Sequence, residues 1–359
     1  SIEMTPEELV KLVKGGEIFD EVDLSQSDYG QLDIAGGIFN KVNFSQCSFK
    51  QSNLRECNFI QCNFTGSDFS KAEFGKANFV TSVFTNSKFL NANMEEANFV
   101  DGDFNHTDLT ASNLTKSNFV NAQMQQAKLI STNLLFTNFI NTNFSNANIQ
   151  QANMDRTNII EGDLEGVSLR DALIKQCVFQ APNLKGQNFA GMDLSMTQFR
   201  EAEMSDCDFT GANLTQTGFM GANLKNSLFD NVIADMAIFY GSKLSGTSFK
   251  GAKLEGVTLN ESDLTDAVFT GARMAKAQLG DANCERAIFS GADLSYADFS
   301  HAILTDADLT NTSLLQAKLH EILDINTLWD GSTKYLAQGI DKKRLKAEQW
   351  KPRPRTGDR

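Results

Sequence analysis

Histidine, cysteine and acidic side chains are the groups best able to do catalytic or metal-binding chemistry. The 359-residue chain has three histidines, His106, His301 and His320, and they take outward or terminal positions. None has a cysteine or carboxylate at the spacing of a known metal or catalytic motif. No glycine-rich phosphate loop precedes a predicted helix. The sequence therefore predicts no catalytic residue, no metal ligand, no cofactor and no enzymatic activity.

A repeat of five residues organises almost the whole chain. From Phe19 to Leu319 every fifth residue is large and apolar, and of these 61 positions only Ala234 and Cys284 are not Leu, Ile, Met, Phe or Tyr. A period of five matches neither a helix nor a strand, so the backbone must turn between successive large residues. The repeat predicts a solenoid.

Each repeat places a small residue two positions before the large one, usually with Asn or Asp between them, as in Ala-Asn-Phe at 97–99. If the small and large residues point inward, they fill a narrow axis and the residue between them faces water. Of the 28 phenylalanines, 27 hold the large position, and the exception is Phe136.

The six cysteines follow the same repeat. One, Cys284, holds a large inward position, and the others hold small inward positions: Cys47, Cys57, Cys62, Cys177 and Cys207. No two are 20 residues apart, so none stacks on another in adjacent coils. We expect buried free thiols that pack as small apolar groups in a reducing compartment.

The repeats resemble those of the pentapeptide-repeat proteins. The A-(D/N)-L-x-x unit of that family is present as Ala-Asn-Leu-Thr-Gln at 212–216 and as Ala-Asp-Leu-Thr-Asn at 307–311, and the resemblance covers about 300 residues. It implies an all-β fold, a right-handed quadrilateral parallel β-helix with four repeats per coil.

A second period, of 20 residues, supports a coil with four sides. Just after the large residue on one side come six β-branched apolar residues in register: Ile60, Val80, Val100, Val120, Ile140 and Ile160. The array then has about 15 coils and a length of about 70 Å at the usual strand spacing. We call these six residues the stripe.

The stripe is the predicted protein-interaction surface, with Phe136 at the corner that leads into it. Six residues in register form a strip about 24 Å long. Further along the chain Met220 and Tyr240 continue the stripe positions, and Met196, Met236 and Tyr296 share the corner of Phe136. The alternative is that β-branched residues only favour extended backbone, which explains Val and Ile but not Phe136.

Three segments are expected: an N-terminal capping helix at 1–16, the β-helix at 17–320, and a C-terminal cap with a basic tail at 321–359. Thr5, Pro6 and Glu8 form a helix start with a capping box, and Gly15 ends the helix. The helix covers the first coil or, alternatively, docks on another protein. Residues 331–359 contain nine Lys or Arg and three acidic residues, which predicts a solvated tail.

Two irregularities are expected in the array. Pro182, Gln187 and Met192 replace the small inward residue in three successive repeats, which predicts a bulge or bend near 180–194. A milder defect is expected at residues 233–234, where the apolar residue shifts by one position.

The formal net charge of −13 raises the possibility of DNA mimicry. Some members of the pentapeptide-repeat family, which the chain resembles, occupy the DNA site of a type II topoisomerase such as gyrase. Such mimicry requires an unbroken line of carboxylates. Lysines interrupt one outward row of this chain and asparagines dilute another. The interrupted row is Asp28, Ser48, Asp68, Lys88, Asp108, Lys128 and Asn148.

The sequence favours a non-enzymatic scaffold or adaptor that binds a protein partner, with the DNA-mimicking topoisomerase inhibitor or protector as the alternative. The partner is a second copy of the chain or a component of a secretion system, and neither direct nucleic-acid binding nor a membrane span is expected. The opening resembles type VI secretion accessory or adaptor arrays through Glu7, Glu8, Leu9, Gly15, Gly16, Val22, Asp23 and Leu24. A cytoplasmic bacterial protein, delivered by a dedicated secretion system, is the matching expectation.

Overall fold

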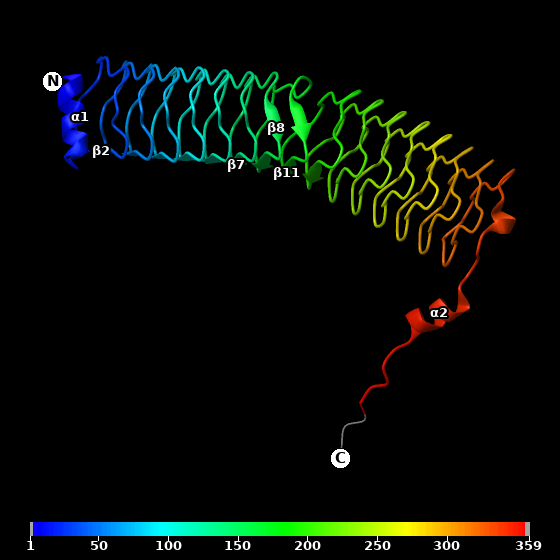
Figure 1. The fold of residues 1–359 in the computed structure, drawn as a ribbon. Coiled ribbons are helices and arrows are strands. Elements are labelled where there is room, and N and C mark those ends of the chain that lie inside the picture. The colour runs from blue at the N-terminus through cyan, green and yellow to red at the C-terminus, as the bar shows by residue number, and fades with distance from the viewer. Residues whose placement is uncertain (1–2, 356–359) are drawn as a thin grey trace.

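A computed structural model describes residues 3–355, which form a long rod with helix α1 (Pro6–Lys14) over its N-terminal end (Figure 1). The first two residues of the expected cap and the last four of the expected tail lie outside the described residues. Twelve short strands, a 3-10 helix and a second α-helix follow α1: β1 (Ile18–Asp20), β2 (Ile38–Asn40), β3 (Asn58–Ile60), β4 (Asn78–Val80), β5 (Asn98–Val100), β6 (Asn118–Val120), β7 (Asn138–Ile140), β8 (Asn153–Asp155), β9 (Asn158–Ile160), β10 (Leu173–Lys175), β11 (Val178–Gln180), β12 (Gln198–Arg200), η1 (Lys334–Leu336) and α2 (Lys342–Gln349).

The chain winds as a parallel β-helix, which confirms the predicted fold class. Ten strands form one sheet in the order β1-β2-β3-β4-β5-β6-β7-β9-β11-β12, and each pairs with its equivalent in the next coil, as β3 does with β4. On the other sides single parallel bridges join equivalent residues of successive coils, as between Asp23 and Asn43. The N–H of a large inward residue donates to a carbonyl of the next coil, as Phe44 does to Asn63 at 2.7 Å.

Regular strands occupy only part of the length expected for about 15 coils. The ten-stranded sheet ends at β12, and beyond it the coils are joined by single bridges on all sides. The number of turns with true strands is therefore smaller than the predicted number of coils. Gly218 pairs with Gln198 of β12 through a single bridge, at the position where a further strand would begin. Glycine weakens extended structure, so the regular sheet ends here.

Four faces are defined by the large inward residue of each repeat. Face 1 follows Phe19 and carries the ten-stranded sheet, face 2 follows Leu24, face 3 follows Tyr29 and face 4 follows Ile34. Each face continues at the equivalent residue of every later coil. Figure 1 shows face 1 along the lower side, where β2, β7 and β11 are labelled.

Stacked aromatic rings fill the axis. On face 1 the ring centroids of Phe79 and Phe99 lie 4.9 Å apart, and those of Phe99 and Phe119 lie 4.7 Å apart. These rings are buried, as are the alanines that take the small inward positions. Where serine replaces alanine, its hydroxyl donates to a carbonyl of the preceding coil, as Ser67 does to Phe44 at 2.7 Å. The axis therefore accepts one small and one large side chain per repeat.

Corners are generally made by a residue in the left-handed region, two positions after the large one, with Asp171 as an exception among the described residues. Lys71 has φ 58° and Gln46 has φ 57°. A side-chain oxygen of the preceding Asn or Asp often caps the corner, as Asn43 accepts from the N–H of Ser45 at 3.0 Å. Asn and Asp thus supply the turn chemistry that the repeat requires.

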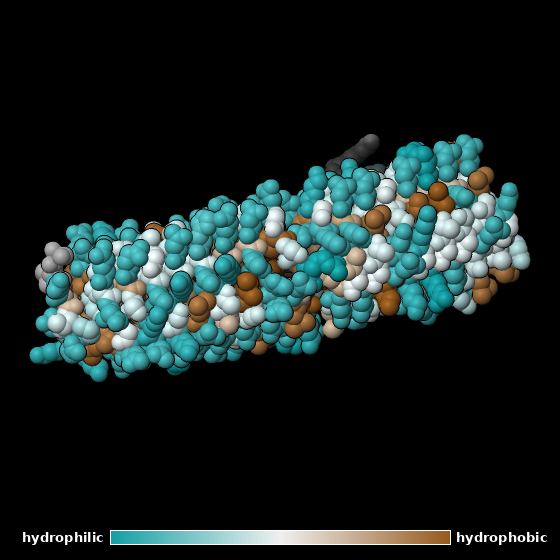
Figure 2. All heavy atoms as spheres, turned by 90° about the horizontal axis from the view of Figure 1, so that it is seen from above, coloured by the Kyte–Doolittle hydropathy of each residue, from teal (hydrophilic) through white to brown (hydrophobic). Residues whose placement is uncertain are grey.

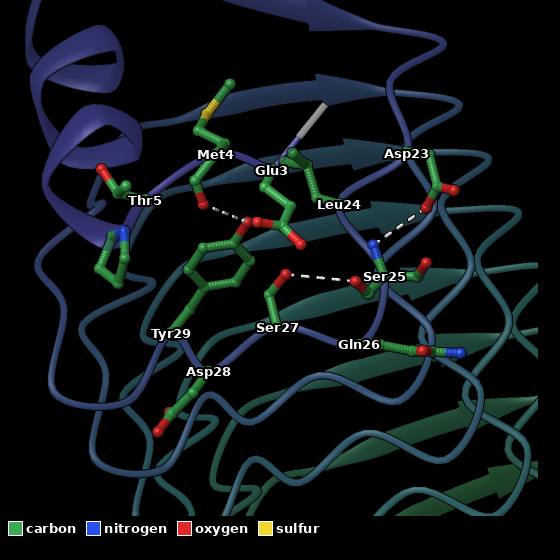
Figure 3. A pocket seen from close by; sticks show the side chains of 11 residues that line it. Glu3, Met4, Thr5, Asp23, Leu24, Ser25, Gln26, Ser27, Asp28 and Tyr29 are labelled. Carbon is green, nitrogen blue, oxygen red and sulfur yellow. Dashed lines mark hydrogen bonds between the residues drawn. The ribbon is translucent and has the colours of Figure 1, made fainter. Parts of the chain in front are cut away.

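The N-terminal cap has the predicted form. Thr5 and Glu8 make the reciprocal bonds of a capping box, and Leu9 and Val13 of α1 are buried against the first coil. The hydroxyl of Tyr29 donates to the carbonyl of Met4 at 3.3 Å. Figure 3 shows this contact at the mouth of a cleft of about 510 Å³ between the segment before α1 and residues 23–29. The cleft is lined mainly by polar groups and is part of the rod's end.

The C-terminal region extends the ladder beyond residue 320, and no residue of α2 is buried. Bridges from Ile303 to Leu323, Asp308 to Leu328 and Lys318 to Gln338 carry the ladder past residue 320. The basic segment then forms α2, which Figure 1 places below the last coils. No helix among residues 3–355 has the length and apolar character needed to cross a membrane.

The ladder is interrupted near the predicted bulge but not at the second predicted defect. The interruption lies on face 3 between residues 148 and 188 and on face 4 between residues 173 and 193, as detailed below. The defect expected at 233–234 is absent, because the N–H of Ile233 donates to Ala212 and that of Ala234 donates to Lys253 in the regular pattern. That expectation was wrong because Ala234 is itself buried in the normal large position.

We predict that Phe99→Ala lowers the free energy of unfolding by about 3–5 kcal/mol, because it removes a buried ring from a stack that cannot fully collapse. Urea unfolding followed by circular dichroism measures the change. The matched exposed substitution Lys128→Ala should change stability by no more than about 0.5 kcal/mol. Equal effects of the two substitutions would contradict the assigned core.

Candidate protein-interaction surface

The six stripe residues end six successive strands of the face 1 sheet. The register pairs Ile60 with Val80, Val80 with Val100, and so on to Ile140 with Ile160. Each follows a buried large residue, and the alternation of the strand turns it outward. The structure therefore brings these residues together in one line.

The stripe is only partly open to water. Ile60, Val80 and Ile140 are 42%, 38% and 38% exposed. Val100, Val120 and Ile160 are half-buried. Neighbouring side chains of the line cover one another, so the stripe presents a low, continuous apolar surface rather than separate projecting groups.

An asparagine ladder holds the strands beneath the stripe. The side-chain N–H of each asparagine after the first donates to the side-chain oxygen of its equivalent in the preceding coil, at 2.7–3.1 Å. The members are Asn58, Asn78, Asn98, Asn118, Asn138 and Asn158. Because the amides hold one another, the strand residues beside the stripe are fixed in position.

Phe136 lies at the corner between faces 4 and 1, as expected. Its side chain is 43% exposed and its backbone has φ 55°. The guanidinium of Arg156, one coil further, lies 5.4 Å from the centre of the ring. A bulky side chain is unfavourable in the left-handed region, so strand propensity does not explain an exposed phenylalanine at this position.

The apolar positions continue into the second half of the rod. Met220 and Tyr240 are 50% and 40% exposed on face 1, and Met196, Met236 and Tyr296 are exposed at the Phe136 corner. Sequence reasoning missed exposed apolar residues at the outward position between the small and large ones: Leu228, Ile233, Ile238, Ile288 and Ile303. The sequence could have revealed them, because each stands where most repeats have Asn or Asp.

Figure 2 shows the rod from above, the side away from β2, β7 and β11 of Figure 1. This side is largely hydrophilic or neutral, and its apolar side chains lie in scattered patches. The side shown in Figure 2 has no continuous line of apolar residues like the stripe on face 1.

Acidic and basic side chains alternate along face 3. Bridges join Asp68 to Lys88, Lys88 to Asp108 and Asp108 to Lys128 in successive coils. A carboxylate therefore has a lysine as its neighbour along this row, which breaks any line of negative charge there.

The structure brings together His301, His320 and Glu348, a cluster that sequence reasoning missed. Glu348 lies on α2, and its two carboxylate oxygens lie 2.5 Å from His301 Nε2 and 3.0 Å from His320 Nε2. His320 is 2% exposed, contrary to the outward or terminal position expected for it. The available signal was that the two histidines are separated by about one coil, which places them in adjacent coils.

The hydrogen bonds of this cluster suit the docking of α2 better than metal binding. The backbone N–H of Asp341 donates to His320 Nδ1 at 3.0 Å, so the ring carries its proton on Nε2 and donates to Glu348. A metal-bound histidine normally donates through its second nitrogen, which here accepts. Arg344 Nε also lies 2.7 Å from Glu348 and its Nη1 lies 2.9 Å from Ser300 Oγ.

We predict that the docking of α2 weakens in acid. Loss of water opposes ionisation of Glu348, but hydrogen bonds from His320 and His301 outweigh it and lower the pKa of the carboxyl below its ordinary value of 4.5. The stabilisation is therefore complete above about pH 4.5 and is lost as the pH falls through the lowered value. Backbone hydrogen exchange of residues 342–349, followed at a series of pH values, measures this loss of docking.

Glu348→Gln is the matched control for this pH dependence. The variant should show fast exchange in α2 at neutral pH and little further change in acid. Exchange in the unmodified protein that stays equally slow throughout the acid range would contradict the role of the carboxylate.

Comparison with known proteins identifies the repeat. The family description "Pentapeptide repeat region" matches residues 22–99, 52–134 and 183–259, and "Pentapeptide repeats (8 copies)" matches 137–176, 247–283 and 287–322. No curated protein gives a significant match.

Several solved structures are similar to parts of the chain. The plasmid-mediated fluoroquinolone resistance protein QnrB1 is 17% identical, with 65% of this chain and 95% of that chain covered and a TM-score of 0.29. A pentapeptide repeat protein from the thylakoid lumen of Arabidopsis thaliana is 30% identical, with coverages of 35% and 70% and a TM-score of 0.21. HetL from the cyanobacterium Nostoc, involved in heterocyst differentiation regulation, is 22% identical, with coverages of 88% and 98% and a TM-score of 0.16. The matched repeats and the β-helix show that the chain belongs to the pentapeptide-repeat family.

Proposed function

We propose that the chain is a non-enzymatic scaffold or adaptor whose face 1 binds a protein partner through the stripe and Phe136. The observation that carries this proposal is the alignment of six apolar residues in one register beside an exposed phenylalanine in left-handed backbone. A rigid, partly exposed apolar line is the kind of surface that a protein interface covers.

The surroundings of the stripe support a protein rather than a small-molecule ligand. The stripe runs over strands β3–β7 and β9 as a low line of side chains, none of which lines a cleft of the described residues, whereas a small molecule requires a concave site. At about 24 Å in length it matches the scale of an interface core. The partner is a second copy of the chain or a component of a secretion system.

The secretion role and the cytoplasmic location of the protein rest on the opening pattern of the sequence. Their support is the resemblance of residues 7–24 to accessory or adaptor arrays, part of which forms helix α1 in the structure. The secretion role and the cytoplasmic location are more specific proposals than the scaffold function. Identifying the partner in the native host would test them.

DNA mimicry is the second candidate, favoured by the net charge of −13. A mimic needs carboxylates in a continuous line. The alternation of Asp68, Lys88, Asp108 and Lys128 opposes this on face 3. A mimic would compete with DNA for a type II topoisomerase, and replacing carboxylates by amides would abolish the competition while leaving a stripe-dependent interaction intact.

We predict that Val100→Asp/Val120→Asp abolishes partner capture, because two carboxylates in the centre of the stripe would be desolvated without partners. Quantitative pull-down from the native host, together with sedimentation analysis of self-association, measures the loss. Thr110→Asp/Ile130→Asp is the matched control, since it places the same charges at the equivalent repeat positions of face 3.

Loss of a captured protein or of self-association in the stripe variant alone would support the proposal. Equal capture by the unmodified protein and both variants would show that the stripe reflects strand propensity, and would contradict the interface. Circular dichroism confirms that each variant retains the fold.

A further inference from the structure

The hydrogen-bond ladder opens on two of the four faces in the middle of the rod. Among the described residues, face 3 has no bridge from Asn148 to Ser168 or from Ser168 to Asn188. On face 4, β10 pairs with β8, but no bridge joins Leu173 to Asp193. Bridges resume one coil later, at Asn188 with Asp208 and at Asp193 with Asn213.

Oversized inward side chains account for the opening between the coils at 164–176 and 184–196. Pro182, Gln187 and Met192 stand where most coils have alanine, serine or cysteine. Pro182 is buried, while Gln187 and Met192 are half-buried, so the latter two do not fit fully into the axis. Because the axis accepts only a small residue at these positions, the coil at 184–196 cannot close against the coil before it.

Side chains take the place of the missing ladder on the open side. Gln187 Nε2 donates to the carbonyl of Val167 at 2.7 Å. Arg170 Nη1 lies 2.6 Å from the carbonyl of Ala190, 3.3 Å from Asn188 Oδ1 and 3.5 Å from Asn188 O. Two clefts of about 340 and 240 Å³ lie along residues 146–171 and 164–187.

Face 1 remains continuous through the same coils. β9 pairs with β11 and β11 pairs with β12 without a break. Face 2 also keeps its bridges from Asp163 to Asn183 and from Asn183 to Glu203. The opening is therefore one-sided, and Figure 1 shows the axis bending at these coils toward the side of β2, β7 and β11.

We infer that residues 164–196 form a hinge that lets the two halves of the rod change their relative direction, with face 1 as the pivot. Elsewhere, bending would break backbone ladder bonds on the convex side. Here those bonds are already replaced by contacts of two flexible side chains, Gln187 and exposed Arg170, which can follow a change in spacing.

The hinge goes beyond the proposed function and does not depend on it. If face 1 binds a partner, the hinge would set the angle between the stripe, which ends at Ile160, and the exposed Met220 and Tyr240 beyond it. That consequence rests on the proposed function, whereas flexing of the rod can be measured in the isolated protein.

Pulsed electron–electron resonance between spin labels tests the hinge. Labels on Lys116→Cys and Gln216→Cys span it, and labels on Gln216→Cys and Gln316→Cys span an equal length of chain within the regular second half. The native cysteines are buried, and burial raises the pKa of Cys57 to about 12, so they remain unlabelled. We expect a broader distance distribution for the first pair than for the second.

Two variants test the cause. Gln187→Ala/Met192→Ala should narrow the distribution of the hinge pair to that of the control pair by letting the ladder close, and Arg170→Ala should broaden it. If the two label pairs gave distance distributions of equal width in the otherwise unmodified chain, the hinge would be overturned. A fixed bend would also give this result, because it shifts the mean distance without broadening the distribution. No narrowing in the double variant would overturn the assignment of Gln187 and Met192 as its cause.

Discussion

The structure depends on the width of its axis, which admits one small and one large side chain per repeat. Rings such as Phe79 and Phe99 stack along it at 4.9 Å, and the small inward residues leave the space that these rings need. Because successive coils stack in register, each inward side chain meets its equivalents in the coils before and after it. Dispersion contacts and ladder hydrogen bonds therefore add along the rod, as expected for a quasi-one-dimensional fold.

The same constraint leaves the outward positions free to serve function. A corner requires only a residue that tolerates left-handed backbone, and the position after a large residue points away from the axis. Amide ladders and single ion pairs satisfy most outward positions on the N-terminal half, as Asn98 and Asn118 do. Where the chain departs from that pattern in one register on one face, as it does at the stripe and Phe136, the departure contributes little to the core and is available for binding.

Several departures from the repeat lie where the axis is interrupted or ends. Leu9 and Val13 of α1 cover the first coil. At the other end α2 is held by charge-assisted hydrogen bonds of Glu348 to His301 and His320, with little apolar burial. In the middle, Gln187 enters the small position and opens the ladder on one side. The exceptions at α2 and at Gln187 exchange part of the regular packing for polar contacts, whereas α1 covers its end of the axis with apolar side chains.

The sequence by itself determined a four-sided solenoid, the buried cysteines, and the location of the stripe and Phe136, because the periods of five and 20 fix which side chains point inward and how many repeats make a coil. The resemblance to the pentapeptide-repeat family implied the β-helix, and local helix signals predicted the capping box of Thr5 and Glu8. Only the tertiary structure decided the joining of Glu348 to His301 and His320, because α2 reaches across the last coils by a path that no period encodes. It also decided that Ala234 is accommodated without a defect and that the bend is one-sided. Those outcomes depend on how neighbouring coils share space, and a pattern along one chain does not contain that information.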